Sequence, residues 1–421
     1  MKNSKKIYHV EDKLPFKLLL PLSIQHTFAM FGASVLVPIL FKINPGIVLF
    51  MNGIGTLLFI LITKKKAPAY LGSSFAFLAP GTAIIASQGF QYAQGAFIVV
   101  GTLGCFLAYI IYKFGIGWID VVLPPAAMGS VVALIGFELA GNTVTGGSIG
   151  ANLMTDTANY KDFIIFGITL FTAIIGSVSF KGFLSTIPIL IAIVVGYICS
   201  VFFGMVDFTP VLEAKLFTLP NFSAPKFSIE AILSMLPVIL VITSEHISHQ
   251  VVTSNIIGRN LLEDPGLHRS IFADNFSSAL SGLVGGVPTT TYGENIGVMA
   301  ITGVYSVQVI GAAAIISILM AFVGPLAALI QTIPGDVIGG VTFLLYGMIG
   351  TSGIRLLVDQ KVDYSKSINL ILTSTIFIAG LSGLSIKFGS IQLQGMVLAS
   401  VVAVLLSAFM TLLRKLNLIN Q

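Results

Sequence analysis

The sequence alternates long apolar stretches with short polar connections from one end to the other. Most of these stretches contain about the 20 residues that an α-helix needs to cross the hydrocarbon core of a bilayer. Such a pattern predicts an all-α polytopic membrane protein. Fourteen stretches, and therefore fourteen expected transmembrane segments, can be traced at 15–41, 44–63, 68–88, 92–112, 118–141, 162–180, 183–204, 229–255, 271–287, 288–303, 306–333, 335–357, 367–385 and 391–413.

The composition excludes several other classes of protein. Of the 421 residues, 55% are hydrophobic and 9% are charged, whereas about a quarter are charged in an ordinary soluble domain. A soluble enzyme, a disordered chain and a nucleic-acid-binding protein are therefore excluded. An outer-membrane barrel is excluded because its strands alternate polar and apolar residues. Cys105 and Cys199 lie within apolar stretches, so neither a disulfide nor a metal site is expected, and no cofactor is expected.

The basic residues predict how the chain is oriented. If the N-terminus is cytoplasmic, seventeen of the 22 Lys and Arg residues fall in connections on the cytoplasmic side. The opposite side holds the remaining five, which are Lys42, Lys161, Lys215, Lys226 and Lys387. Such an excess of positive charge is typical of cytoplasmic loops. We therefore expect both termini in the cytoplasm and a first segment that is retained rather than cleaved.

The third and tenth stretches are interrupted by small, polar and helix-breaking residues. The first interruption covers residues 68–81 and the second covers 285–295. The threonines after Pro288 favour extended backbone, so we expect a short strand that leads into a half-helix starting near Gly293 or Glu294. Extended backbone at membrane depth is tolerated only where protein covers it or a cavity solvates it. The sequence therefore implies a cavity beside these breaks.

The two interruptions are separated by about 219 residues, and other features recur at a similar spacing. The Gln-His pair at 25–26 has a counterpart in the Glu-His pair at 245–246, and the Pro-x4-Gly pattern at 124–129 recurs at 334–339. Together these matches predict two repeats of seven segments. Because seven is odd, the second repeat must be inverted in the membrane, an arrangement typical of secondary transporters.

Acidic residues inside apolar stretches indicate a functional site. Glu245, Asp274 and Glu294 lie deep in apolar surroundings, and Glu138 is a fourth candidate. An ionised carboxylate at the bilayer centre costs about 2.5 to 3.5 kcal/mol on the insertion scale, so these positions are expected to be used in function.

Histidines near Glu245 suggest a route for protons. Glu245 and His249 are four residues apart, which places them on one face of a helix and within reach of each other. We expect this pair to exchange protons, and the alternative is a structural buried hydrogen bond. His246 is rotated by about 100° and points elsewhere, so it is expected to be structural, as is His26.

A metalloenzyme is the alternative that the Glu-His-x-x-His pattern at 245–249 raises. A zinc site needs a third ligand from elsewhere, and the only further candidates are carboxylates on another interrupted segment. The sequence also has no Gly-rich phosphate loop of the Walker type. Neither a metal site nor an enzyme is therefore expected.

Four motifs carry a family resemblance. Segments 70–77, 245–249, 264–270 and 290–303 resemble the nucleobase/ascorbate transporter family, and within it the bacterial uracil permeases. The likeness runs from about residue 15 to residue 413. It implies a proton-driven importer of uracil in the bacterial cytoplasmic membrane, with a tendency to form homodimers. It also implies a core domain, from 15–115 (segments 1–4) and 229–333 (segments 8–11), and a gate domain, from 116–204 (segments 5–7) and 334–413 (segments 12–14).

The resemblance also implies roles for individual residues. Glu245 and Glu294 would accept hydrogen bonds from the base, and the backbone amides of Phe75 and Gly293 would donate to its carbonyl groups. Uracil suits such a site because its flat ring carries two N–H donors and two carbonyl acceptors. Phe75 and Tyr292 are candidates for packing near the ring, and the alternative is that they belong to the apolar core or the aromatic belt. Tyr346 matches a residue of the family that faces the site, and Thr342 lies nearby in the sequence.

Two alternatives stay open for the function. One is a symporter for another nucleobase, such as thymine, xanthine or uric acid. The other is an anion exchanger of the same architecture, which would require positive charge at the midplane, where this chain has acids and no Lys or Arg.

Overall fold

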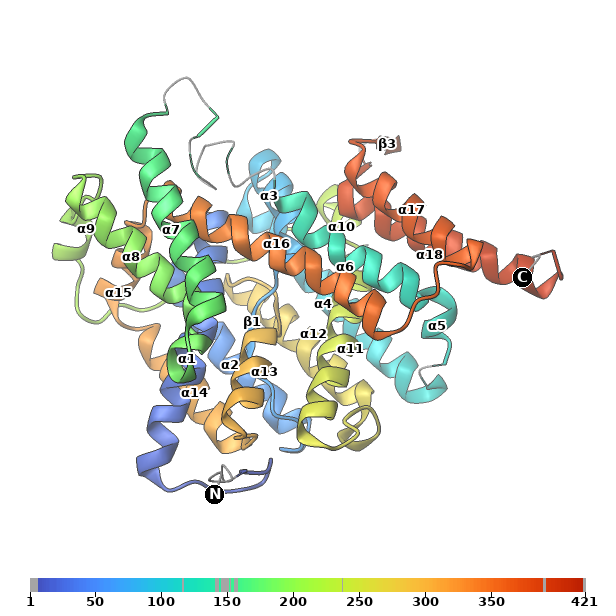
Figure 1. The fold of residues 1–421 in the computed structure, drawn as a ribbon, viewed down its shortest axis with the longest axis horizontal. Helices are drawn as coiled ribbons and strands as arrows, with labels where there is room; N and C mark the ends of the chain where they lie inside the picture. Colours follow the sequence, from blue (N-terminus) through green and yellow to red (C-terminus); the bar gives the residue numbers. More distant parts are fainter. Residues whose placement is uncertain are drawn as a thin grey trace.

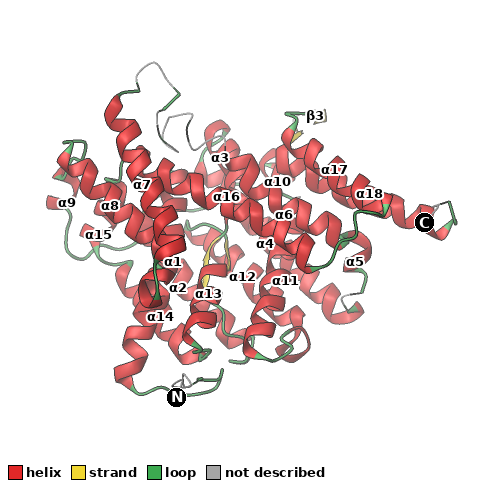
Figure 2. Cartoon of the chain, viewed as in Figure 1, coloured by secondary structure: helices red, strands yellow, loops and turns green. Residues whose placement is uncertain are grey.

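The computed structural model describes residues 7–115, 117–140, 144, 151, 153–154, 158–236, 238–388 and 391–418. Helices make up most of this part of the chain (Figures 1 and 2). The helices are α1 (Phe16–Phe41), α2 (Pro45–Ile62), α3 (Leu78–Ser87), α4 (Phe90–Phe114), α5 (Ile119–Val122), α6 (Pro125–Ala140), α7 (Tyr160–Ser179), α8 (Pro188–Phe202), α9 (Thr209–Leu212), α10 (Ile229–Met235), α11 (Val238–Ile257), α12 (Leu267–Val284), α13 (Gly293–Thr302), α14 (Val307–Met320), α15 (Gly324–Gln331), α16 (Gly335–Asp359), α17 (Ser367–Leu381) and α18 (Gly395–Lys415). Each predicted apolar stretch overlaps at least one of them.

Seven helices in the described residues are long and apolar enough to cross a membrane, judged by length and composition. They are α1, α2, α4, α7, the α10–α11 segment, α16 and α18. Five shorter apolar helical segments of 10–17 residues accompany them: Phe75–Ser87, Pro125–Ala140, Pro188–Phe202, Val307–Met320 and Ser367–Leu381. The chain is therefore a largely helical, multi-pass membrane protein.

Two short strands meet in the middle of the molecule (Figure 2). Strand β1 (Leu71–Ser73) pairs antiparallel with β2 (Thr289–Thr291), and all the residues of both strands are buried. Strand β1 leads through a short 3₁₀ turn, η1 (Phe75–Phe77), into α3, while β2 leads into α13, which begins at Gly293. The predicted strand and the predicted start of the helix after Pro288 are both confirmed.

The helices pack in pairs that repeat between the two halves of the chain. The contact between α2 and α14 has a counterpart in the contact between α12 and α4. Likewise, the contact between α7 and α8 has a counterpart in the contact between α17 and α18. Helices α6 and α16 pack against each other, and each also packs against a helix of the other half, α17 and α7 respectively. Figure 1 shows α6 and α16 crossing the middle of the molecule side by side. Contacts made by one half are thus matched in the other.

Glycines bring α6 and α16 into backbone contact. A Cβ placed on Gly353 would lie 2.2 Å from the backbone nitrogen of Ala133. A Cβ on Gly136 would lie 2.1 Å from the carbonyl oxygen of Tyr346. Close approach through small residues is how helices pack within membranes, where neighbouring lipid is as apolar as the helix itself. This packing fixes which side of α16 turns toward the centre of the molecule.

The apolar stretch at 306–333 was expected to be one segment, and the structure corrects this. Helix α14 ends at Met320, and α15 begins at Gly324, with Pro325 in its first turn. Proline lacks an amide hydrogen and disfavours helical backbone in the residue before it, so the chain turns there. The amide of Gly324 donates instead to Leu216 O at 3.2 Å.

The expected segment at 391–413 also begins later than predicted. Residues Ile391–Gln394 form strand β4, which pairs with β3 (Ser385–Phe388) in an exposed hairpin, and helix α18 starts only at Gly395. Gly395 has a positive φ of 55°, a conformation that glycine adopts without strain and that separates the strand from the helix. The apolar pattern alone did not distinguish this strand from a helical turn.

An N-terminal segment, residues 7–15, lies against the loops at one end of the molecule. The amide of Tyr8 donates to Gly303 O, and the amide of Val307 donates to Val10 O, both at 3.0 Å. Val10 is 1% exposed and packs with the ends of α2 and α11. Arg259 pairs with the carboxylate of Glu11, with Nη2 2.9 Å from Oε2. The segment therefore ties the first half of the chain to loops of the second half.

Candidate functional site

A cavity of about 730 Å³ lies between the central strands and helix α16. One wall is formed by residues at the two breaks and on α11, and the other by α16 with two residues of α6. The residues that line it are Phe75, Val132, Ile135, Glu245, Ser248, His249, Val252, Tyr292, Gly293, Glu294, Leu345, Met348, Ile349, Thr351, Ser352, Arg355, Leu356 and Asp359. Five of the six residues expected to bind the substrate, and the expected proton-coupling histidine, are among them.

The two predicted carboxylates line this same cavity from different elements. Glu245 comes from the middle of α11, and Glu294 from the first turn of α13. Glu294 is exposed to the cavity, whereas Glu245 is half-buried. Within the described residues, Oε2 of Glu245 is buried and has no hydrogen-bond partner. A buried carboxylate oxygen without a donor is unfavourable by about 1 to 3 kcal/mol or more, so this atom is suited to accept from a ligand.

The start of α13 lies at the cavity. The first backbone amide of α13 that donates a hydrogen bond to the preceding turn is that of Ile296, which donates to Tyr292 O at 3.3 Å. The preceding amides at a helix N-terminus have no partner within the helix. Gly293 and Glu294 both line the cavity, so their backbone lies beside it. Phe75, which opens the 3₁₀ turn after β1, brings the other break to the same cavity.

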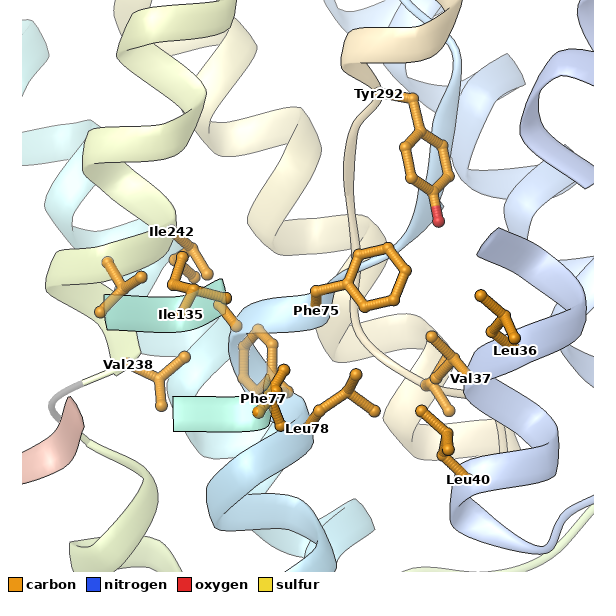
Figure 3. Packing of buried hydrophobic residues seen from close by; sticks show 14 of the residues in the cluster. Leu36, Val37, Leu40, Phe75, Phe77, Leu78, Ile135, Val238, Ile242 and Tyr292 are labelled. Atoms are coloured by element: carbon orange, nitrogen blue, oxygen red, sulfur yellow. The ribbon is translucent and has the colours of Figure 1, made fainter. Parts of the chain in front are cut away.

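The aromatic residues at the site have distinct roles in packing. Figure 3 shows the Phe75 side chain between Tyr292 and the aliphatic side chains of α1. The hydroxyl of Tyr292 donates to Ser73 O at 2.9 Å, so this residue also ties the start of α13 to strand β1. Tyr292 is 4% exposed and Phe75 is 7% exposed. Both residues are therefore buried where they line the cavity.

Tyr346 was expected to face the site, and the structure places it one layer behind. Its ring packs edge-on against Phe75, with centroids 6.4 Å apart, and it does not line the cavity. Leu345, Met348 and Ile349 supply that wall of α16 instead. Successive helix residues are rotated by about 100°, so the phase set by the packing of α6 on α16 turns Tyr346 away. Thr342 is also buried, and its hydroxyl donates to Ile338 O at 2.8 Å.

His249 lines the cavity as expected, but its partner differs from the prediction. Its Nδ1 lies 3.0 Å from Oγ1 of Thr291, on strand β2. No hydrogen bond joins Glu245 and His249 in the part of the chain that the structure describes. The spacing of Glu245 and His249 places both residues on one face of α11. The imidazole is nevertheless hydrogen-bonded to Thr291 on the neighbouring strand.

His246 and Asp274 form a buried pair outside the cavity lining. Nδ1 of His246 lies 3.3 Å from Oδ2 of Asp274, with the side chains 1% and 2% exposed. His246 thus points away from Glu245, as the helical spacing predicted. Asp274 was expected to act in function, yet it is not a cavity residue. Its Oδ2 also lies 3.4 Å from the Oγ1 of Thr290, so it holds strand β2 against α12.

Glu138 and His26 also have partners away from the cavity lining. Oε2 of Glu138 accepts from the amide of Met396 at 2.8 Å, where α18 begins. Nδ2 of Asn295 lies 3.0 Å from both Nδ1 and the carbonyl oxygen of His26, which joins α1 to α13. The structural expectation for His26 is in agreement with this contact.

Polar residues of α16 and α11 also line the cavity, and these were not predicted from the sequence. Thr351, Ser352, Arg355 and Asp359 follow one another along the C-terminal half of α16, and Ser248 lies on α11. Ser352, Arg355 and Asp359 are spaced three and four residues apart, which is typical of one helix face and was the available signal. Nε of Arg355 lies 3.4 Å from Oδ2 of Asp359 at this end of the cavity. No group of three or more His, Cys, Asp and Glu side chains among the described residues is placed to hold a metal ion.

Comparisons with known proteins agree with this architecture. The chain is 53% identical over 405 residues to the uracil permease of Escherichia coli strain K12, covering 96% of this chain and 94% of that one. It is 48% identical over 418 residues to the uracil permease of Paenibacillus larvae, covering 99% of each. Its fold resembles the murine anion transporter Slc26a9 in the inward-facing state, with a TM-score of 0.72 and 10% identity, over 96% of this chain and 69% of that one.

The family model described as the Permease family matches residues 17–389, which is most of the chain. The matched region contains the two central strands, the half-helices that follow them and every residue that lines the cavity. The chain therefore belongs to this permease family.

Proposed function

We propose that this permease is a proton-coupled secondary transporter that imports uracil across the bacterial cytoplasmic membrane by alternating access. Two relatives that match nearly the whole chain, at 48% and 53% identity, are uracil permeases. The similarity covers both breaks and the cavity between them and α16. This supports uracil above thymine, xanthine or uric acid as the substrate.

The observation that carries this proposal is the unpartnered carboxylate oxygen of Glu245 in the wall of a cavity shared with Glu294. Two carboxylates accept hydrogen bonds, so they suit a flat ligand with two N–H groups. The backbone of Gly293 and Phe75 would donate to the carbonyl groups of the same ring. Phe75 and Tyr292 would cover its apolar part. An anion would instead meet two acids here, which disfavours an anion exchanger.

The proposed architecture is two inverted repeats of seven transmembrane segments, with the third and tenth segments interrupted by β1 and β2. The matched helix pairs of the two halves support it, as does the antiparallel pairing of the two strands. In this arrangement, segments 1–4 and 8–11 form the core domain that carries both breaks. Segments 5–7 and 12–14 form the gate domain, whose α6 and α16 supply the opposite wall of the cavity.

The charge pattern supports an orientation for the cavity. Arg355 and Asp359 line it at the end of α16 that precedes Lys361 and Lys366, on the side where most basic residues fall. By the positive-inside rule that side is cytoplasmic. We infer that the cavity opens toward the cytoplasm and that both termini lie on the same side.

Proton coupling is assigned to Glu245 and His249. Both line the cavity and lie one helical turn apart on α11. Since they are not hydrogen-bonded to each other, each is available to a ligand or to water in the cavity. A group that binds substrate and also takes up a proton links the two events, because each changes the affinity for the other.

The test is calorimetric titration of the purified protein with uracil and with cytosine. Cytosine replaces one ring N–H with an acceptor nitrogen, which would face a carboxylate. Rejection of such a mismatch by a hydrogen-bonding site reaches several orders of magnitude. We expect heat of binding with uracil and none with cytosine, and equal affinities would refute the two-acceptor site.

A further inference from the structure

The imidazole of His249 is held between strand β2 and the cavity. Nδ1 lies 3.0 Å from Oγ1 of Thr291. The other ring nitrogen, Nε2, lies near Gly293, because a Cβ placed on Gly293 would be 3.5 Å from it. The two nitrogens therefore have different surroundings. One meets a strand residue, and the other meets the first residue of α13, beside the place assigned to the base.

Thr291 is well suited to hold a ring in one orientation. It is 1% exposed and pairs with Leu71 in the antiparallel register of β1 and β2. The next amide, of Tyr292, donates to Tyr70 O at 3.0 Å, so the backbone is fixed on both sides. Threonine is also branched at Cβ, which restricts its side-chain torsion. The hydroxyl is thus presented at a fixed point.

The neighbouring threonines of β2 direct their hydroxyls to other partners. Oγ1 of Thr289 lies 2.7 Å from Oγ of Ser277, and Oγ1 of Thr290 lies 3.4 Å from Oδ2 of Asp274. Both partners are on α12, behind the strand. Among the described contacts, Thr291 is the threonine of β2 whose side chain is bonded to a residue of the cavity wall.

We propose that Thr291 is a positioning residue that acts through His249. Its hydroxyl is hydrogen-bonded to Nδ1 of His249. Nε2 is then the nitrogen that faces the base and exchanges a proton with the cavity. In a neutral imidazole one nitrogen carries hydrogen and the other accepts, and the partner of one nitrogen sets the state of the other. This rests on the proposed function, in which His249 takes part in proton coupling.

The hydroxyl can be removed while the shape of the side chain is kept. Thr291→Val in proteoliposomes should lower proton-driven uracil accumulation about tenfold, the effect of losing one hydrogen bond. Uracil exchange without a proton gradient, and uracil affinity, should stay within about threefold of wild type. Thr291→Ser, which restores a hydroxyl, should recover accumulation.

Thr289→Val is the matched control, because it removes a buried hydroxyl contact from the same strand without touching His249. Its ratio of accumulation to exchange should equal that of wild type. If Thr289→Val lowers the ratio as much as Thr291→Val does, the loss comes from the strand, and the positioning role is wrong. An unchanged ratio in Thr291→Val would overturn it equally.

A spectroscopic readout tests the contact without transport. With ¹⁵N-labelled histidine, the ring signals of His249, identified by their absence in His249→Ala, should shift in Thr291→Val and not in Thr289→Val. Unshifted signals in Thr291→Val would contradict the proposal. Failure of the proposed function would be recognised differently, because the wild-type protein itself would then not accumulate uracil under a proton gradient.

Discussion

At the scale of single residues, the proposed function rests on the two acids of the cavity. Glu245 and Glu294 line the same cavity from segments about 50 residues apart in sequence. Their cost in an apolar environment is offset when a ligand donates to them. The same two acids that are unfavourable in the empty cavity would therefore favour binding of a ligand that donates hydrogen bonds to them.

Replacing Glu294 by glutamine should weaken uracil binding about 10- to 100-fold. The amide removes a charged acceptor, and a hydrogen bond to a charged group is worth about 1.5 to 3 kcal/mol. Calorimetric titration measures the change. Glu263→Gln, at an exposed position outside the cavity, is the control and should bind as wild type does. Unchanged affinity in Glu294→Gln would remove this carboxylate from the site.

Gly72 is expected to tolerate no side chain. A Cβ there would lie 1.4 Å from Cε2 of Tyr292, so Gly72→Ala must displace the ring and break its bond to Ser73 O. Overpacking of this kind costs about 1 to 3 kcal/mol, and we expect a lower melting temperature in detergent. Gly297→Ala, where a Cβ meets nothing within 4 Å, should leave it unchanged or raise it. Equal melting temperatures for the two variants would show that the ring can move freely.

At the scale of elements, the sequence predicts the breaks well because their chemistry is local. Prolines, glycines and β-branched residues near Pro288 specify a strand and a helix start without help from the rest of the chain. That local geometry places Gly293 and Glu294 at the start of a half-helix directly after a strand. The positions of Tyr346 and of the His249 ring depend instead on how whole helices are rotated against their neighbours. An apolar helix in a membrane carries little sequence signal of that rotation, since lipid and protein favour the same residues.

The N-terminal segment gives a pH prediction at the same scale. Hydrogen bonds from Arg259 lower the pKa of Glu11 below its ordinary value of 4.5. A lowered pKa means that the pair stabilises the fold above that ordinary value and loses this effect as pH falls through the lowered pKa. The side chains are 43% and 54% exposed, so the contribution is at most about 1 kcal/mol.

Glu11→Gln should therefore lower the melting temperature near neutral pH, and the difference from wild type should disappear as pH falls through the lowered pKa of Glu11. High salt should reduce the difference as acid does, since it screens exposed charges. Arg259→Gln should have a similar effect, and the double variant should be no less stable than either single variant. A difference between wild type and Glu11→Gln that persists in acid would contradict the ion pair as its cause.

At the scale of the whole molecule, the two halves of the chain meet at the site. Strands β1 and β2 come from opposite halves and pair with Leu71 opposite Thr291, so the breaks are held side by side in the middle of the molecule (Figure 1). Helices α6 and α16 cover the cavity from the other side. Movement of this pair against the strands would open and close the cavity while the acids stay in place, as alternating access requires.

In the proposed function, a proton gradient drives uracil into a cavity that contains two carboxylates. The deciding measurement is uptake of labelled uracil into proteoliposomes that contain the purified protein, with and without a proton gradient directed toward the cytoplasmic face. We expect accumulation above equilibrium only with the gradient, loss of that accumulation when a protonophore is added, and competition by unlabelled uracil but not by cytosine. Uptake that only equilibrates regardless of the gradient, or that cytosine inhibits as well as uracil does, would contradict the account.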